Sequence, residues 1–459
     1  MHQIIAIAML SLRNAVRSKI VLSLMVMLLA VVVLMPLTIK GDGTVAGLIQ
    51  ILLSYTLGLA GLILSLTSLW AGCAAVASDV QDKSIQMVAT KPVASWQLWL
   101  GKWLGLMVMN VALVAVSGGA TYSMLRWHLH PERLTDPARQ REAAELLAAR
   151  IEVRPVVPDT RDEARQRLET RLARDPLPPG TTARDVLKAL EQQVAIEQQT
   201  VRPAGQQRWT FPPVLIDRAS AAVTLQYRFS SSLMGVTGVK GRWLAGTDQQ
   251  PVLLEVARES VPRALNTISL ELDERWRGKP LVLTYIDMDP AGGTVLFDLH
   301  DGLRVLAPHR GFDGNFARAL LVMLGQVAFF TALGVTAGCL FSLPVAAFVS
   351  LFLLLLVQMA SYIEGIAGNE LVLPWQTDIP GEAMPWGTVL VTLVFKGLAM
   401  LLSPLVQESV LEHLATGRFI SYAWTVRGLL VQGVLYALVM CAVSAGIMNR
   451  RELALPGSS

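Results

Sequence analysis

The chain consists of two apolar blocks with a long polar block between them. Residues from about Lys19 to Leu125 and from about Ala319 to Asn449 are mostly apolar, whereas Arg126 to Arg318 holds most of the charged side chains. Apolar segments of about 20 residues are long enough to cross a bilayer as helices. The pattern therefore predicts a multi-span membrane protein with one large water-soluble insertion between two of its spans.

The apolar blocks predict six transmembrane helices. The uncharged stretch between Arg318 and Glu364 is long enough for two of them, and Pro344 marks the break because proline ends or restarts a helix. The other four predicted spans are Ile20–Ile39, Thr44–Ser78, Trp103–Leu125 and Gly428–Asn449.

Two further segments are predicted to lie on the membrane surface. Met1–Lys19 has the pattern of an amphipathic helix that leads into the first span. Trp386–Pro404 is apolar but contains Lys396, which favours an interfacial helix on the outer face, near residues 386–414. A re-entrant or a spanning helix is the alternative for residues 386–404.

The placement of lysine and arginine predicts the orientation. Cations precede the first span, lie between the second and the third, and follow the last. In a six-span arrangement all three groups fall on one face, which the positive-inside rule makes cytoplasmic. We expect both termini in the cytoplasm and residues 126–313 outside it, in the cell (inner) membrane of a bacterial-type cell.

The insertion changes its periodicity along its length. Pro131–Val201 has helical spacing in runs such as Ala138–Ile151, and prolines divide it into about three helices. From Trp209 the pattern alternates with period two, as in Val223–Phe229, which is typical of a β-sandwich. The predicted fold is an α-helical integral membrane protein with an inserted α+β extracytoplasmic domain containing a β-sandwich. Its predicted parts are residues 1–125, 126–208, 209–313 and 314–459.

Composition supports the membrane interpretation and narrows the chemistry. Of the 459 residues only 16% are charged, and the mean hydropathy is +0.48. The net charge of +4 is explained by basic loops near anionic lipid, so no nucleic-acid partner is expected. We find no catalytic, metal-binding or cofactor-binding set. Gly101-Lys102 lacks the upstream glycine and the hydroxyl residue of a phosphate loop, so no enzyme activity is predicted for this chain.

The loop between the second and third spans is the strongest functional candidate. Asp79 and Asp82 start a predicted short helix, where negative charge favours the helix dipole. Ile85 and Val88 form one apolar face, and Lys91-Pro92 ends the helix. Such a helix, joined to two spans, would transmit force from a bound partner, although an ordinary surface loop explains the same pattern equally well. The candidate residues are Asp79, Asp82, Lys83, Ile85, Val88, Lys91, Pro92, Gly101 and Lys102.

This loop resembles the coupling-helix region of type-2 ABC transporter permeases. The last predicted span is followed by Arg450-Arg451-Glu452-Leu453, which is similar to a tail frequent in that family. The branch it resembles most is that of permeases grouped with multicopper-enzyme maturation, although the large outer domain departs from those compact proteins. The resemblance implies the membrane subunit of an ATP-driven transporter, and we expect it to be an exporter. It also implies a separate ATPase partner that carries MgATP, and a second permease subunit, either identical or homologous.

A second hypothesis stays open beside the transporter. The β-sandwich would be the working part, as a sensor or a binding domain for a cell-envelope protein or lipid partner, and the spans would be its anchor. Six spans are more than an anchor requires, which favours the transporter. The substrate, the direction of transport and the choice between homodimer and heterodimer do not follow from the sequence.

Overall fold

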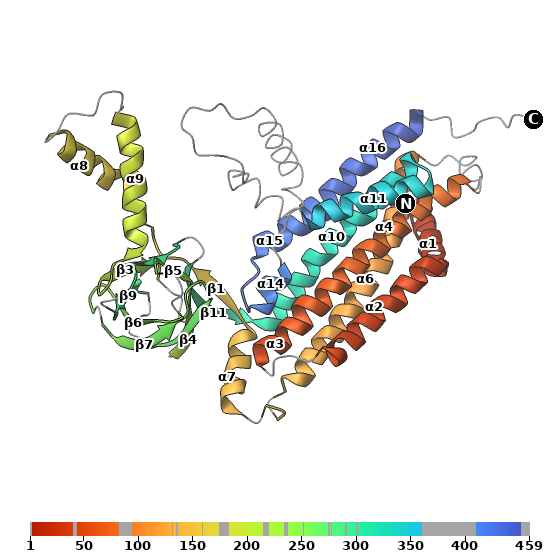
Figure 1. The fold of residues 1–459 in the computed structure, drawn as a ribbon. Coiled ribbons are helices and arrows are strands. Elements are labelled where there is room, and N and C mark those ends of the chain that lie inside the picture. The colour runs from red at the N-terminus through yellow and green to blue at the C-terminus, as the bar shows by residue number, and fades with distance from the viewer. Residues whose placement is uncertain are drawn as a thin grey trace, which may run out of the picture. The chain divides into compact units, whose positions relative to one another are not determined.

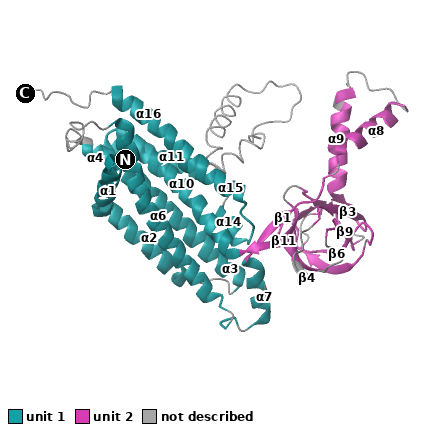
Figure 2. Ribbon diagram, turned by 180° about the vertical axis from the view of Figure 1, so that it is seen from behind, with its two compact units in different colours: residues 1–147, 312–459 teal, residues 148–311 magenta. Residues whose placement is uncertain are grey.

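The computed structural model forms two compact units (Figure 2). Unit 1 comprises residues 1–147 and 312–459, and unit 2 comprises residues 148–311. The description that follows covers the chain except residues 1, 40–43, 82–93, 131, 135, 158, 174–182, 214–219, 234–236, 251, 274–275, 277, 290–291, 300–301, 360–409 and 451–459. Unit 2 therefore begins later than the insertion boundary predicted at residue 126.

Unit 1 is a helical bundle whose long helices run side by side (Figure 1). The chain begins with α1 (His2–Arg17) and α2 (Lys19–Thr38). It continues through α3 (Val45–Gln50), a π-helical segment Ile51–Thr56, and α4 (Leu57–Gln81), which form one apolar rod. The remaining helices of the unit are α6 (Ser95–His128), α7 (Pro137–Leu146), α10 (Phe312–Leu340), α11 (Leu343–Gln358), α14 (Val410–Ala415), α15 (Tyr422–Arg427), a π-helical segment Gly428–Leu435, and α16 (Tyr436–Arg450).

Five stretches of the described chain are long and apolar enough to cross a membrane. They are Lys19–Thr38, Val45–Asp79, Ser95–His128, Phe312–Leu340 and Tyr422–Arg450. Helix α11 is also apolar but has only 16 described residues, shorter than a usual span. The break at Pro344 lies where it was predicted, between α10 and α11. The coarse prediction of an apolar helical part with a separate β part is confirmed.

Glycines allow the helices of unit 1 to approach closely. A Cβ placed at Gly334 or Gly338 of α10 would collide with the backbone of α4 at Leu69 or Cys73. Gly72 of α4 faces α10 in the same way, at Thr331 and Val335. Small residues at four-residue spacing are a common means of close helix packing in membranes. Here the Gly334-x-x-x-Gly338 motif serves a contact within one chain.

The junction between the units differs from the helical prediction. The run Ala138–Ile151 was predicted to be helical throughout, but α7 ends at Leu146 and the chain continues as strand β1 (Ala148–Val153). Strand β1 pairs antiparallel with β11 (Leu303–Gly311), with Ala148 opposite Gly311. Pairing with a distant segment overrides the local helical preference of these residues.

The described residues of unit 2 form three antiparallel sheets (Figure 1). Their strand orders are β1-β11-β4-β8, β2-β10-β5 and β3-β9-β6-β7. Helices α8 (Thr160–Leu172) and α9 (Ala183–Gln199) lie between β1 and β2 in the sequence. The other strands are β2 (Thr200–Val201), β3 (Gln206–Phe211), β4 (Ser220–Tyr227), β5 (Phe229–Ser231), β6 (Val239–Gly246), β7 (Leu254–Ser260), β8 (Asn266–Asp273), β9 (Leu281–Asp287) and β10 (Val295–Phe297).

One aromatic core joins the three sheets of unit 2. Trp209, Tyr227, Trp243, Tyr285 and Phe297 are buried and come from strands of all three sheets. Their rings pack in tilted and edge-to-face arrangements, with Trp243 and Tyr285 centroids 5.0 Å apart. Large aromatic side chains bury much apolar area and prefer such geometries. Unit 2 therefore has a hydrophobic core of its own.

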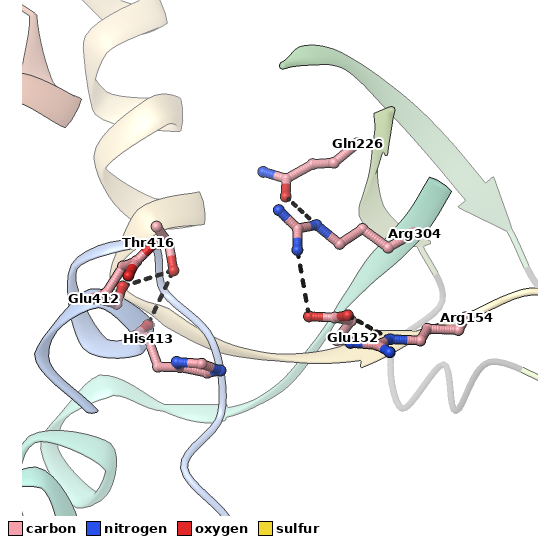
Figure 3. A network of polar contacts seen from close by, with 7 residues as sticks. All are labelled: Glu152, Arg154, Gln226, Arg304, Glu412, His413 and Thr416. Atoms are coloured by element: carbon pink, nitrogen blue, oxygen red, sulfur yellow. Dashed lines mark hydrogen bonds and ion pairs between the residues drawn. The ribbon is translucent and has the colours of Figure 1, made fainter. Parts of the chain in front are cut away.

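Polar side chains link strands β1, β11 and β4 to one another (Figure 3). Arg304 of β11 donates to the side chain of Gln226 on β4 at 3.1 Å and lies 3.8 Å from Glu152 of β1. Glu152 also pairs with Arg154 at 2.9 Å. These side chains cross the strands whose backbones are already paired, which adds to the cohesion of the sheet.

The buried side chain of Asp287, at the end of β9, makes the stability of unit 2 depend on pH. Its carboxyl is buried, and one oxygen, Oδ1, accepts from the Asp289 N–H at 3.1 Å. The other oxygen has no hydrogen-bond partner among the described residues. Burial raises the pKa of this carboxyl. The folded protein therefore favours the protonated carboxyl. This contribution to stability is complete below about pH 3.9, the pKa of an aspartate in the unfolded chain, and is lost as the pH rises through the raised pKa of the folded protein.

We therefore expect Asp287→Asn to stabilise unit 2 at pH 7, by about 1 kcal/mol, because the cost of a buried ionised carboxyl is removed. Hydrogen exchange of the β9 and β6 amides in the full chain, compared at acidic and neutral pH, measures the effect. Asp248→Asn, on the exposed ion pair with Arg208, is the matched control and should change little. Lower protection in Asp287→Asn at pH 7 would contradict the assignment.

Candidate functional site

The structure describes only part of the predicted coupling region. Asp79, Gly101, Lys102 and Arg450 are described. The other candidates, Asp82, Lys83, Ile85, Val88, Lys91, Pro92, Arg451 and Glu452, lie outside the described residues, as do residues 386–409 of the predicted outer interfacial helix. The site is therefore built from the ends of the helices on either side of the loop.

An ion pair between a buried lysine and a partly exposed aspartate joins these two helix ends. Lys102 Nζ of α6 donates to Asp79 Oδ2 and to the Ala75 carbonyl, both of α4. The Lys102 side chain is only 6% exposed, and that of Asp79 is 29% exposed. Hydrogen bonds in which both groups are charged are about twice as strong as neutral ones. The pair fixes the end of α4 against the start of α6, across the whole predicted loop.

Gly101 lies beside this pair and faces helix α1. A Cβ at Gly101 would collide with the side chain of Ile7, and one at Gly105 would collide with the backbone of Ala8. The second small-residue motif, Gly101-x-x-x-Gly105, thus allows α1 to pack closely on α6. Helix α1 is held against the same helix that carries Lys102.

Arg450 ends α16 near the start of α6. The preceding residue, Asn449, accepts a hydrogen bond from Ser95 Oγ at 2.6 Å, and Met448 packs with Leu98 in a small apolar cluster. Cys339, next to the end of α10, lies against the same cluster. Thus α1, the end of α4, the start of α6 and the ends of α10 and α16 gather at one end of unit 1 (Figure 1).

Sequence reasoning missed a set of polar contacts inside the apolar helices. Asn110 of α6 donates to Thr331 of α10 at 2.9 Å, and Ser68 of α4 donates to the Asn110 side-chain oxygen at 3.0 Å. All three are buried. An asparagine in an apolar span was the available signal, because polar side chains there usually hydrogen-bond between helices.

Thr336 forms a second polar contact within the bundle. Its hydroxyl accepts from Trp99 Nε1 of α6 and from Ser444 Oγ of α16, each at 3.2 Å. Together with the Asn110 contacts, it connects α4, α6, α10 and α16. These bonds oppose sliding and rotation of the four helices, so the bundle is held as one body.

At the other end of unit 1, the buried side chain of Arg318 lies against two aromatic rings. Arg318 of α10 is buried and lies 4.7 Å from the ring centres of both Phe419 and Tyr422. It donates to the Asn315 side chain at 3.1 Å, and Asn315 also accepts from the Ile420 N–H at 2.8 Å. These contacts fix the segment between α14 and α15 on α10, so they serve architecture.

In the described part of unit 1, polar side chains join the helices to one another. Within the described residues, no group of three His, Cys, Asp or Glu side chains is placed to hold a metal ion. The contact that stands out among the described residues is the ion pair of Lys102 on α6 with Asp79 on α4. No family model, no curated protein and no solved structure matches the chain.

Proposed function

We propose that the chain is the membrane subunit of an ATP-driven ABC-2 type transporter, working as an exporter with a separate ATPase. The observation that carries the proposal is the buried Lys102–Asp79 pair. It ties together the two helices that flank the predicted coupling loop, so a push on residues 82–93 would move α4 and α6 together. An ordinary surface loop would not require an ion pair between the two helices that flank it.

In this proposal α11 provides the sixth crossing. The end of unit 1 that gathers α1, Asp79, Ser95 and Arg450 faces the cytoplasm, as its cations require. Unit 2, with its three sheets around one core, then lies outside the cytoplasm and is inserted in the sequence between α7 and α10. Two copies, or one copy and a homologous subunit, build the transport path.

Motion would pass along the bundle by rigid displacement. The contacts of Asn110 and Thr336 couple α4, α6, α10 and α16 at several depths. Because packed helices move as bodies rather than bending continuously, a displacement of the α4 and α6 ends reaches α10. Helix α10 follows directly on the last strand of unit 2, which lets the outer unit respond.

Docking of the ATPase is tested by charge reversal in the loop. Asp79 is a poor choice, because a lysine there would face Lys102 and disturb the fold. We expect Asp82→Lys with Lys91→Glu to lose the ATPase subunit during mild detergent purification while the chain stays folded, since like charges meet across the interface. Mass spectrometry of the co-purifying proteins and chain-dependent ATP hydrolysis measure the result.

The matched control reverses exposed charges in unit 2. Asp162→Lys with Arg165→Glu alters a solvent-exposed pair on α8 and should leave ATPase recovery unchanged. Full recovery of the ATPase with the loop variant would refute the docking assignment.

The sensor hypothesis has one observation in its favour. Unit 2 is a compact unit with its own aromatic core, as an independent binding domain requires. The same purification separates the two functions. If the unaltered chain is recovered with no ATPase in several mild detergents, the sensor replaces the transporter; a stoichiometric ATPase decides for the transporter.

A further inference from the structure

Three buried polar atoms on two neighbouring strands of unit 2 have no hydrogen-bond partner among the described residues. They are Trp243 Nε1 on β6, the Tyr285 hydroxyl on β9 and Asp287 Oδ2 at the end of β9. The three side chains are only 1–2% exposed. A buried polar group without a hydrogen bond costs free energy, so such groups are usually satisfied by water where no protein group reaches them. Three of them in one core therefore point to an occupant.

The pairing of β6 with β9 places these three side chains on one face of the sheet. Trp243 lies directly opposite Tyr285, and Gly241 lies directly opposite Asp287. Side chains two residues apart on a strand point to the same side, so all of them face the core. A Cβ built on Gly241 would collide with the end of the Tyr285 ring and with its hydroxyl oxygen. The hydroxyl therefore occupies the place of a side chain opposite Asp287.

The Tyr285 hydroxyl and the Asp287 carboxylate are neighbours that do not bond to each other. Cβ atoms of directly opposite residues in an antiparallel pair are about 5 Å apart, so the hydroxyl beside Gly241 lies about that far from Asp287 Cβ. Burial raises the pKa of Tyr285, and the nearby charge of Asp287 raises it further. Two polar groups at such a separation can be joined by one bridging water.

The chemistry of the three groups selects water as the occupant. Trp243 Nε1 only donates, the Asp287 carboxylate accepts, and the Tyr285 hydroxyl does both. The indole N–H disfavours a cation and the carboxylate disfavours an anion, whereas water donates and accepts. The ring centroid of Trp243 lies 5.0 Å from that of Tyr285 and 4.9 Å from that of Tyr227. Rings in such contact favour an occupant of the size of water over a larger molecule.

We propose that unit 2 binds ordered internal water, which bridges the Tyr285 hydroxyl and Asp287 Oδ2 and accepts from Trp243 Nε1. Beside this site the Tyr227 hydroxyl and Ser260 Oγ, both buried, are hydrogen-bonded at 2.6 Å. Water and hydroxyls thus form a polar layer within an otherwise aromatic core. Strands β6 and β9 are held together there by bridging water as well as by their backbone ladder. The inference concerns unit 2 alone and does not depend on the proposed transport function.

Hydroxyl-radical labelling of the full chain by a pulse of X-rays, read by mass spectrometry, tests the site. Radicals formed from bound water oxidise the side chains beside it, even where bulk solvent does not reach. We expect Trp243 to be labelled, whereas Trp276, also 2% exposed but with its Nε1 donating to the Gly246 carbonyl at 3.4 Å, should stay unlabelled. Protection of Trp243 equal to that of Trp276 would overturn the proposal. Equal labelling of both would also overturn it, because it would report opening of the whole core.

A variant without the acceptor locates the water. Asp287→Leu replaces the carboxylate with an apolar group, so we expect the label on Trp243 to be lost. Asp248→Leu, on the exposed ion pair with Arg208, is the matched control and should keep the label. An unchanged label on Trp243 in a folded Asp287→Leu chain would overturn the bridge. The comparison of Trp243 with Trp276 uses the unaltered chain, so it decides even if this variant fails to fold.

Discussion

Replacing Lys102 with methionine is expected to destabilise the helical unit by about 3 kcal/mol, the lower end of the cost of breaking a buried ion pair. Methionine keeps most of the apolar stem but removes the ammonium group that donates to the Asp79 carboxylate and to the Ala75 carbonyl. The lower end applies because Asp79 is partly exposed. The thermal unfolding midpoint of the purified chain, followed by tryptophan fluorescence, measures the loss.

Two comparisons make this result specific. Arg126→Gln breaks the pair with Asp313, whose side chains are 50% and 63% exposed, and should cost less than about 1 kcal/mol. The double variant Lys102→Met with Asp79→Asn should be more stable than the sum of the single changes, because residues in contact couple. Strictly additive effects would show that the pair does not form.

Gly334→Leu is expected to destabilise the bundle by about 3 kcal/mol, the upper end for overpacking. A Cβ at this position already meets the Leu69 carbonyl of α4, and a backbone atom cannot move aside as a side chain can. Relief requires α4 and α10 to separate, which would also strain the Asn110–Thr331 hydrogen bond. The folded fraction after gel filtration and the unfolding midpoint report the change.

Gly119→Leu is the matched control on α6. Nothing lies within 4 Å of a Cβ at Gly119, and leucine is the better helix former, so stability should stay within about 0.5 kcal/mol or rise. If the two leucine variants behaved alike, the close packing of α4 on α10 would be wrong.

The apolar pattern predicts membrane-type helices better than it predicts their ends. The first span, predicted as Ile20–Ile39, is observed as α2 over Lys19–Thr38. The third, predicted as Trp103–Leu125, extends from Ser95 to His128. Hydropathy identifies only the apolar part of a helix. The helix itself can extend into polar residues and ends where a capping residue or a change of backbone conformation stops it. Alternation likewise located β4 within the run Val223–Phe229, because one face of this strand lies in the core.

What the sequence could not provide is the pairing of residues across helices. Lys102 reaches Asp79 only through the rotation of α6 against α4, and no local pattern encodes that rotation. Asn110 is visible as a polar residue in an apolar run, but its partners Ser68 and Thr331 look like ordinary small residues. The strand β1 was missed because its partner β11 lies at the far end of the insertion.

The pairing of β1 with β11 brings the two ends of unit 2 together. Ala148 and Gly311, the first and last residues of unit 2, are opposite each other in one antiparallel ladder. Opposed residues in such a ladder have Cα atoms about 5 Å apart. A module whose two ends meet can be excised, or exchanged for another, with only a short turn left in its place. The unit inserted between α7 and α10 could therefore be exchanged without breaking the helical unit, and a version with residues 148–311 replaced by a two-residue turn would retain its helices.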